Sequence, residues 1–297
     1  MNKEKKISII LPAYNEVDAI GVVLDKLVPM ATERGWEVIV VDDGSNDGTG
    51  KVAGEHGAKV LTHQHNRGYG ASLSTAVRAT DADVVVFMDS DGQHNHNDIP
   101  SLLEHIDQHD MVVGARTKDS YVDPYRMPGK KLLKWFANYL AKEKIPDINS
   151  GFRAFRRDVL LRYLHLMPQG FSFSTTSTFA MLKGGHQIKW IPIQTTRRIG
   201  TSTVKQLKHG PETMMLMLRL TVLFDPLRVF LPVSGILMLL AIIATAVNFI
   251  QDFLNEVYRL AVPASALFLG ISAVIIFMLG LLTDQVSAIR REQHKRL

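Results

Sequence analysis

The sequence has no cysteine among its 297 residues. Without thiols the chain forms no disulfide bond, and no thiolate can serve as a metal ligand. A sequence without cysteine fits a reducing compartment.

The N-terminus also lacks the pattern of a secretory signal peptide. The apolar run 7–11 follows a charged start, but it is too short for the core of a signal peptide. No small-residue cleavage site follows it. We therefore expect the first 200 residues, which have the composition of a soluble domain, to remain unexported.

Charge of one sign is not in strong excess either. The formal net charge is +5 at pH 7, and hydrophobic residues make up 46% of the chain. This modest basic balance leaves phosphorylated substrates, anionic lipid and nucleic acid open as partners. The hydrophobic residues are unevenly distributed, because two long apolar runs lie in the last quarter of the chain.

The first half of the chain alternates short apolar runs with amphipathic stretches. This order predicts an α/β fold with a mainly parallel sheet and helices on both faces. The expected strands are 7–11, 37–41, 59–61, 83–88 and 111–113. The expected helices are 17–31, 47–56, 70–80 and 98–108. Beyond them we expect helices at 130–143 and 173–182, a loop entering a strand at 147–155, and a strand at 187–191.

Polar clusters follow three of the expected strands, at 12–16, 42–45 and 89–91. Ligands of such sheets bind beyond the carboxyl ends of the strands. We therefore expect the three clusters to contribute to one site.

The triplet Asp89-Ser90-Asp91 is the most informative of these clusters. Two carboxylates at the end of a buried strand are costly to bury without a counter-charge. A hard divalent cation takes carboxylate oxygens and usually binds substrate phosphates as well. The triplet therefore indicates a cation site for a sugar or nucleotide diphosphate, and a simple polar turn is the alternative.

The other two clusters suit recognition of a nucleoside. The Tyr14 ring can stack on a base, and Glu16 can accept a hydrogen bond from a ribose hydroxyl or a base N–H. Asp42 and Asp43 can read the N–H edge of a pyrimidine. Gly68, at the start of an expected helix, allows backbone N–H groups to approach an anion. Ordinary turns and helix caps are the alternatives.

The two long apolar runs, 229–250 and 260–283, predict a C-terminal transmembrane hairpin. Each matches the ~20 residues that a helix needs to cross the hydrocarbon core, and buried helices of a soluble protein are the alternative. Basic residues flank the pair, so the positive-inside rule places both ends and the preceding domain in the cytoplasm. The segment 214–224 is either an interfacial helix or a helix packed on the soluble domain.

The motifs as a set resemble those of family 2 glycosyltransferases with the GT-A fold. They are P-A-Y-N-E at 12–16, D-D-G-S-N-D-G-T at 42–49, N-R-G-Y-G-A at 66–71 and D-S-D-G-Q-H at 89–94. The S-G-F-R-A-F-R-R run at 150–157, the R-R-I-G-T-S-T run at 197–203 and the hairpin are similar to one branch of that family. This branch comprises dolichyl-phosphate mannose synthases and bacterial polyprenyl-phosphate glucosyltransferases.

The resemblance implies an inverting transferase that moves one sugar from a UDP- or GDP-sugar to a polyprenyl phosphate. The implied partners are the nucleotide sugar, the lipid and the bilayer, with no nucleic acid, and a homo-oligomer is left open. The implied domains are a cytoplasmic GT-A domain at 1–203, a juxtamembrane segment at 204–227, a hairpin at 228–283 and a basic cytoplasmic tail at 284–297.

The resemblance also implies roles for individual residues. The residues that the resemblance assigns to nucleotide-sugar binding are Pro12, Ala13, Tyr14, Glu16, Asp42, Asp43, Gly68 and Ser90. The resemblance assigns binding of the cation, Mg2+ or Mn2+, to Asp89, Asp91 and Gln93. It also implies that the two aspartates are catalytic. Guanidinium groups suit bidentate phosphate contacts, and the basic candidates for phosphate binding are Arg116, Arg126, Lys130, Arg153, Arg197 and Arg198. Solvated surface charges are the alternative for each base.

Two departures from the family pattern concern the loops around the site. Residues 94–97 read His-Asn-His-Asn where many relatives have a proline, and Lys205 comes later than the usual S-K pair. A polar loop is the favoured interpretation of His94 and His96, ahead of a metal-binding pair.

A general base is the point on which the candidate reactions differ. A phosphate monoester, with a second pKa of about 6, is already mostly dianionic at pH 7. Asp147 is the candidate base if one is used, and a loop carboxylate paired with an arginine is the alternative. A transferase with a lipid hydroxyl acceptor would need such a base, whereas an inactive nucleotide-sugar-binding scaffold would not. A processive polysaccharide synthase is disfavoured because the chain has no Q-x-x-R-W motif.

Overall fold

The computed structural model describes residues 5–117, 135, 137–141, 143–170, 172–199, 206–255 and 261–295. The chain forms two compact units, which comprise residues 1–217 and 218–297. The boundary falls inside the segment expected to be juxtamembrane, 204–227, and the finer division into four regions stays a prediction.

Unit 1 is built on a seven-stranded sheet in the order β3-β2-β1-β4-β6-β5-β7. The strands are β1 (Ile7–Ala13), β2 (Glu37–Asp42), β3 (Lys59–Thr62), β4 (Val84–Phe87), β5 (Met111–Arg116), β6 (Arg153–Arg156) and β7 (Ile188–Ile193). Only β6 runs antiparallel to its neighbours, β4 and β5. The expectation of a mainly parallel sheet is confirmed, and the five strands predicted in the first half are all present.

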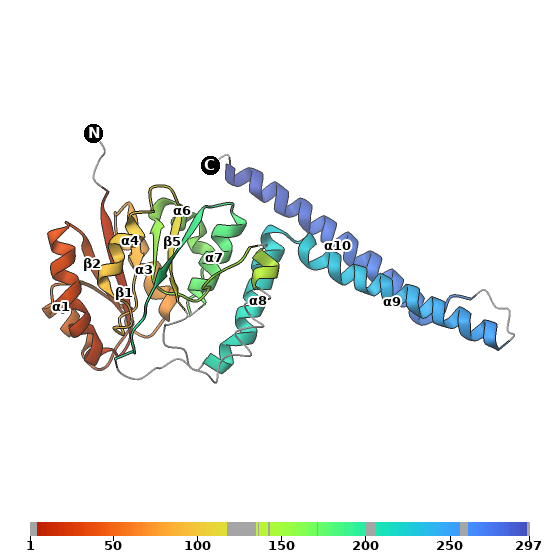
Figure 1. Cartoon of the computed structure of the whole chain (residues 1–297), viewed down its shortest axis with the longest axis horizontal. Helices are drawn as coiled ribbons and strands as arrows, with labels where there is room; N and C mark the ends of the chain where they lie inside the picture. Colours follow the sequence, from red (N-terminus) through yellow and green to blue (C-terminus); the bar gives the residue numbers. More distant parts are fainter. Residues whose placement is uncertain are drawn as a thin grey trace. The chain divides into compact units, whose positions relative to one another are not determined.

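Helices cover both faces of this sheet (Figure 1). The helices of unit 1 include α1 (Val17–Glu33), α2 (Thr49–Glu55), α3 (Tyr69–Ala79), α4 (Ile99–Leu103), α6 (Arg157–Tyr163) and α7 (Phe173–Lys183). The first, second and fourth pack on one face, and the others pack on the opposite face. The helix expected at 98–108 is shorter than predicted: α4 begins at Ile99 and ends at Leu103.

The two cores follow from the alternation of side chains along each strand. In β1, Ile9 and Leu11 point into the core beneath α1, whereas Ile10 points into the core beneath α3. The strands are apolar on both faces because both faces are covered, as is usual for parallel sheets. Buried apolar area of this kind fixes the strand register and thereby the positions of the strand ends.

The order of the strands brings the three polar clusters together. β1 lies between β2 and β4 and is parallel to both, with Ala13 beside Asp42 and Ile10 beside Phe87. The chain moves outward from β1 in one direction to reach β2 and β3, and it reaches β4 on the other side. This reversal makes the carboxyl edge of β1 a switch point, where such sheets bind ligands.

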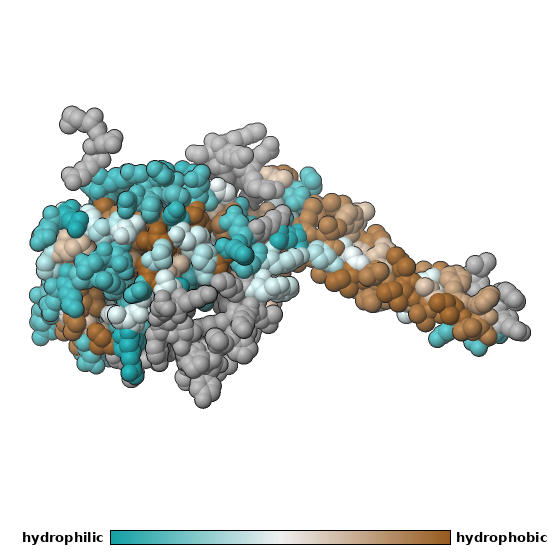
Figure 2. Space-filling model, viewed as in Figure 1, coloured by the Kyte–Doolittle hydropathy of each residue, from teal (hydrophilic) through white to brown (hydrophobic). Residues whose placement is uncertain are grey.

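Unit 2 contains two long apolar helices, α9 (Leu227–Leu254) and α10 (Ala264–Lys295). By length and composition, Leu227–Leu254 and Ala264–Ile289 are each able to cross a membrane. Their surfaces are largely hydrophobic, and few of their side chains are buried (Figure 2). A buried soluble helix would not expose such a surface, so the predicted apolar hairpin is confirmed. The helix before it, α8 (Gln206–Phe224), includes the segment 214–224.

Candidate functional site

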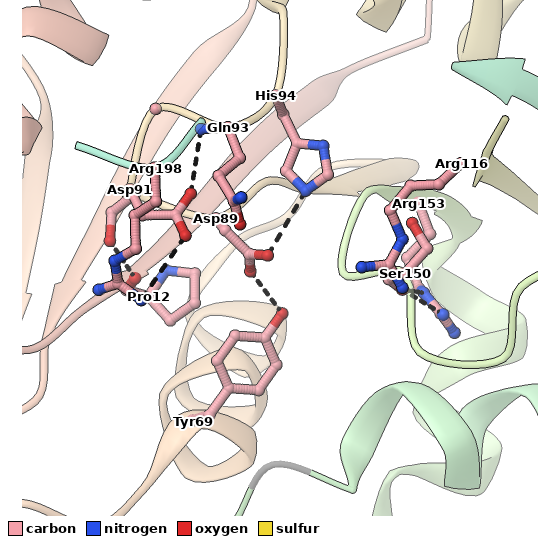
Figure 3. Close-up of polar contacts among 12 residues, drawn as sticks. Pro12, Tyr69, Asp89, Asp91, Gln93, His94, Arg116, Ser150, Arg153 and Arg198 are labelled. Atoms are coloured by element: carbon pink, nitrogen blue, oxygen red, sulfur yellow. Dashed lines mark hydrogen bonds and ion pairs between the residues drawn. The ribbon is translucent and has the colours of Figure 1, made fainter. Parts of the chain in front are cut away.

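The site is centred on Asp89-Ser90-Asp91, which begins two residues after β4 ends at Phe87. Figure 3 shows Asp89 and Asp91 with the side chains around them. Ser90 is buried, and its hydroxyl donates a 2.9 Å hydrogen bond to the Pro12 carbonyl oxygen. This bond ties the triplet to the end of β1. The side chains of Asp89 and Asp91 are 29% and 11% exposed, so both carboxylates are accessible to a small ligand while largely shielded from bulk water.

Two side chains approach Asp89. The Tyr69 hydroxyl, at the start of α3, donates to Asp89 Oδ1 over 2.9 Å. The His94 Nε2 atom lies 3.5 Å from Asp89 Oδ2. Burial alone would raise the pKa of Asp89, but the contacts with His94 and Tyr69 outweigh it and lower the pKa below the ordinary value. Asp89 is therefore held as a carboxylate.

Asp91 has a different electrostatic environment. Burial, together with the negative charge of Asp89, raises the pKa of Asp91. The backbone N–H of Gln93 donates to Asp91 Oδ1 over 3.1 Å, and Arg198 Nη1 lies 3.7 Å from Asp91 Oδ2. Two neighbouring carboxylates with opposite pKa shifts form a site that gains from an added positive charge.

Residues 196–199 form a strap across this motif, and Arg198 belongs to it. The Thr196 N–H donates to the Gln93 carbonyl oxygen, and the Ile199 N–H donates to the Asp91 carbonyl oxygen, each over 3.0 Å. Arg198 also donates to the Glu16 carboxylate. Burial raises the pKa of Glu16 to about 7, although the positive charge of Arg198 acts in the opposite direction. Arg198 thus supplies positive charge to the buried Asp91 and the partly buried Glu16.

Asp43 is committed to internal hydrogen bonds. Its carboxylate accepts from the backbone N–H of Arg67 at 2.9 Å and of Gly68 at 2.7 Å, and it lies 2.6 Å from His63 Nδ1. Asp42 likewise accepts from the N–H of Ser45 at 2.9 Å. These bonds fix the loops that enclose the end of β2. A direct nucleoside contact of either aspartate stays a prediction.

Arg116 and Asp147 form a bidentate ion pair. Arg116 Nε and Nη2 donate to the two oxygens of Asp147 over 2.6 and 2.9 Å. Burial alone would raise the pKa of Asp147, but the hydrogen bond and positive charge of Arg116, together with the backbone N–H donors of Asn149 and Arg116, lower it below the ordinary value. A carboxylate held in this way is a weak proton acceptor, so the geometry favours the paired carboxylate over a general base.

Arg153 lies in the core, in contrast to the expectation of a base available to phosphate. Its side chain is fully buried, and its guanidinium donates to the carbonyl oxygens of Ser150 and Ser174 and to the hydroxyls of Ser177 and Thr178. Burial lowers its pKa to about 10, where it is still charged at neutral pH. These contacts join β6 to α7, and they indicate a structural role.

The other predicted residues are spread around this arrangement. Pro12, Ala13 and Tyr14 lie at the carboxyl end of β1, and Arg197 is exposed in the strap. Arg126 and Lys130 lie outside the described residues. Tyr69 and His94 were not predicted as site residues. The N-R-G-Y-G-A motif does contain Tyr69, but no sequence signal shows which way a tyrosine at a helix start will point.

The residues present fit a divalent cation by the chemistry of their donor atoms. No group of three or more acidic or histidine side chains placed to hold a metal occurs within the described ranges. The predicted set instead combines the carboxylates of Asp89 and Asp91 with the amide of Gln93, and hard cations accept both kinds of oxygen. The Gln93 amide nitrogen lies 3.4 Å from the Thr196 carbonyl oxygen, which leaves the amide oxygen available as a ligand.

The titration of Glu16 predicts a pH dependence of stability. Its pKa is about 7 in the fold against 4.5 ordinarily, so the folded chain binds this proton more tightly than the unfolded chain. The resulting stability is fully present below pH 4.5 and is lost as the pH rises through about 7. Relative to Glu16→Gln, the wild type should lose up to about 3 kcal/mol of unfolding free energy. Unfolding temperatures in detergent between pH 4.5 and 8.5 measure the change.

Glu33→Gln is the matched control, because Glu33 is an exposed glutamate at the end of α1. The unfolding temperature of this variant is measured over the same pH range and compared with that of the wild type. A difference between wild type and Glu16→Gln that is constant with pH would show that Glu16 does not titrate in this way.

Comparisons with known proteins identify the family of the chain. Residues 8–164 match the model of glycosyl transferase family 2, and residues 225–289 match the GtrB C-terminal hairpin. A dolichyl-phosphate hexose transferase of Haloferax volcanii is 32% identical over 207 residues, which cover 69% of this chain and 89% of that protein. An undecaprenyl-phosphate mannosyltransferase of Micrococcus luteus is 30% identical over 217 residues, 65% of this chain and 84% of that protein.

A solved structure supports the fold assignment. The glucosyl-3-phosphoglycerate synthase of Mycobacterium tuberculosis, in complex with Mn2+, uridine diphosphate and phosphoglyceric acid, aligns with a TM-score of 0.61 at 22% identity. The alignment covers 73% of this chain and 78% of that one. The sheet is thus of the GT-A type, and the chain belongs to glycosyl transferase family 2, with the GtrB C-terminal hairpin following its catalytic domain.

Proposed function

We propose that this protein transfers a single sugar, with inversion, from a UDP- or GDP-sugar to a polyprenyl phosphate at the cytoplasmic face of a membrane. The observation that carries the proposal is the paired carboxylate site of a family 2 domain in a chain that also has an apolar hairpin. The names of the two relatives, each a transferase that uses a polyprenyl phosphate, support the same acceptor class.

The donor would bind at the carboxyl ends of β1, β2 and β4. Tyr14 and Glu16 would contact the nucleoside, while Asp89, Asp91 and Gln93 would hold Mg2+ or Mn2+ against the diphosphate. The cation would supply positive charge to the departing nucleoside diphosphate. Mn2+ and uridine diphosphate in the Mycobacterium tuberculosis structure support this assignment.

Arg198 would exchange partners when the donor binds. Its guanidinium pairs with Glu16 and lies 3.7 Å from Asp91, where it occupies the place of a counter-charge. A divalent cation between the carboxylates would replace that charge. The guanidinium would then be free to pair with the diphosphate, for which its planar geometry is suited.

The acceptor would bring its own nucleophile. A phosphate monoester is mostly dianionic at pH 7, so its oxygen can attack the anomeric carbon without prior loss of a proton to the protein. One direct displacement inverts the configuration at that carbon, and the protein contributes by aligning the two reactants. The ion pair between Arg116 and Asp147 supports this acceptor over a lipid hydroxyl, because it leaves Asp147 a weak base.

The hairpin would bring the enzyme to its acceptor. Moving a polyprenyl chain into water costs about 0.8 kcal/mol for each CH2 group exposed, so the lipid stays in the bilayer. An enzyme anchored by α9 and α10 meets the phosphate headgroup at the membrane surface.

A transfer assay tests the proposal. Membranes that contain the protein are incubated with polyprenyl phosphate, Mn2+ or Mg2+, and a panel of labelled UDP- and GDP-sugars. We expect a lipid-linked monosaccharide with one donor of the panel. If no donor yields a lipid-linked product, or if product forms only on a lipid without the phosphate, the proposed acceptor is wrong.

The same assay measures the role of Asp91. Asp91→Asn removes a negative charge from the cation site at nearly constant volume, and we expect transfer to fall by about 100-fold or more. Asp107→Asn is the control, because Asp107 is an exposed residue that pairs with Lys5. An Asp91→Asn variant with transfer close to wild type would exclude a cation role for Asp91.

The absence of cysteine allows a direct test of the membrane orientation. Lys51→Cys on α2 and Asn255→Cys at the end of α9 each introduce a single exposed thiol. An impermeant maleimide should label Asn255→Cys in right-side-out vesicles only and Lys51→Cys in inside-out vesicles only. The unmodified chain, which has no thiol, is the blank. Labelling of both variants from the same side would contradict a hairpin that crosses the membrane twice.

A further inference from the structure

The carboxylate of Asp89 is enclosed on several sides by groups that the sequence motifs do not assign to the site. Tyr69 and His94 approach different oxygens of the same carboxylate (Figure 3). The backbone of Gly151 closes a further side, because a Cβ atom added there would lie 2.7 Å from both Asp89 oxygens. The orientation of this carboxylate is therefore strongly restricted.

Tyr69 contacts Asp89 as a hydrogen-bond donor. The 2.9 Å bond from its hydroxyl to Asp89 Oδ1 starts from the first residue of α3. The position of α3 on the sheet therefore sets where this donor lies.

His94 is held by packing. Its side chain is 6% exposed, and its ring stacks on the fully buried Phe152 with a centroid distance of 5.1 Å and an interplanar angle of 15°. The Nδ1 atom is buried and has no hydrogen-bond partner in the part of the chain that the structure describes. The stacked ring presents its other nitrogen, Nε2, to Asp89 Oδ2 at 3.5 Å.

We propose that Tyr69 and His94 are positioning residues, which hold the Asp89 carboxylate in the orientation that binds the divalent cation of the donor site. The proposal rests on the proposed function of that site. Substitution of groups that orient a metal ligand typically lowers metal affinity or activity by 10- to 100-fold. Tyr69 and His94 would act through Asp89, without touching the sugar or the lipid.

A remote group of the same residue types provides matched controls. Tyr163 Oη lies 3.0 Å from His186 Nε2, and His186 Nδ1 lies 3.0 Å from Asp110 Oδ2. Asp110 immediately precedes β5, which runs parallel to β4, so this group lies at the opposite edge of the sheet from Asp89. Substitutions in this remote group remove hydrogen bonds similar to those around Asp89 but leave the site itself unchanged.

The experiment compares Tyr69→Phe and His94→Phe with Tyr163→Phe and His186→Phe in the full-length protein. His94→Phe keeps an aromatic ring against Phe152 but removes the nitrogen that faces Asp89, and His94→Gln restores a donor. Mn2+ binding is measured by electron paramagnetic resonance with Mn2+ alone and with UDP or GDP added. Transfer is measured as a function of Mn2+ concentration, and unfolding temperature reports on the fold.

We expect Tyr69→Phe and His94→Phe to raise the dissociation constant for Mn2+ about 10-fold, and His94→Gln to recover part of this loss. The Mn2+ concentration for half-maximal transfer should rise equally, while the rate at saturating Mn2+ stays near that of wild type. The two control variants should bind Mn2+ like wild type even where their unfolding temperatures fall as much.

Unchanged Mn2+ affinity in both site variants would overturn the proposal, as would equal losses in the control variants. Failure of the proposed function gives a different result. A wild type that binds Mn2+ but transfers no sugar to polyprenyl phosphate disproves that function, and the change in Mn2+ affinity still decides the positioning role. A wild type that binds no Mn2+ overturns the positioning role directly.

Discussion

The electrostatic cost of two neighbouring carboxylates, Asp89 and Asp91, is the constraint on which the rest of the site depends. Like charges in a shielded environment raise each other's pKa, so the pair cannot stay ionised without donors or cations around it. The two carboxylates have different surroundings in the fold. Tyr69 and His94 stabilise the charge on Asp89, whereas Asp91 keeps a raised pKa and lies near Arg198.

This asymmetry links the site to the strap that carries Arg198. The strap is hydrogen-bonded to the backbone of Gln93 and Asp91, the same residues that would hold a cation. A ligand that changes the position of Asp91 therefore acts directly on the strap. Because Arg198 also pairs with the partly buried Glu16, the same movement would reach the end of β1 and the expected nucleoside contacts.

The sequence was sufficient to predict the mainly parallel sheet and the proximity of the polar clusters at its strand ends. Apolar runs ending in polar clusters identified β1, β2 and β4, and the switch-point rule placed their ends together. Two long uncharged runs identified α9 and α10, because the length and hydropathy of a segment can be read directly from its own sequence. The length of α4 was overestimated because the amphipathic pattern continues beyond the residues that form the helix.

The contacts between side chains were not predictable in the same way, because they depend on packing between distant segments. The S-G-F-R run predicts that Arg153 is a base accessible to phosphate. In the structure it lies in the core, where hydroxyl and carbonyl groups of α7 accept its hydrogen bonds. His94 reads as part of a polar loop, but stacking on Phe152 buries it beside Asp89. The pairing of Asp147 with an arginine was foreseen as an alternative, although the sequence did not identify Arg116 as the partner.

The pairing of Arg116 with Asp147 also bears on the choice of acceptor. A hydroxyl acceptor must lose a proton during transfer, and a carboxylate already engaged by a bidentate arginine is poorly suited to take it. A dianionic phosphate has no such requirement, and its negative charge would instead benefit from a nearby guanidinium. Thus the ion pair weakens Asp147 as a base, and a dianionic phosphate acceptor does not need that base.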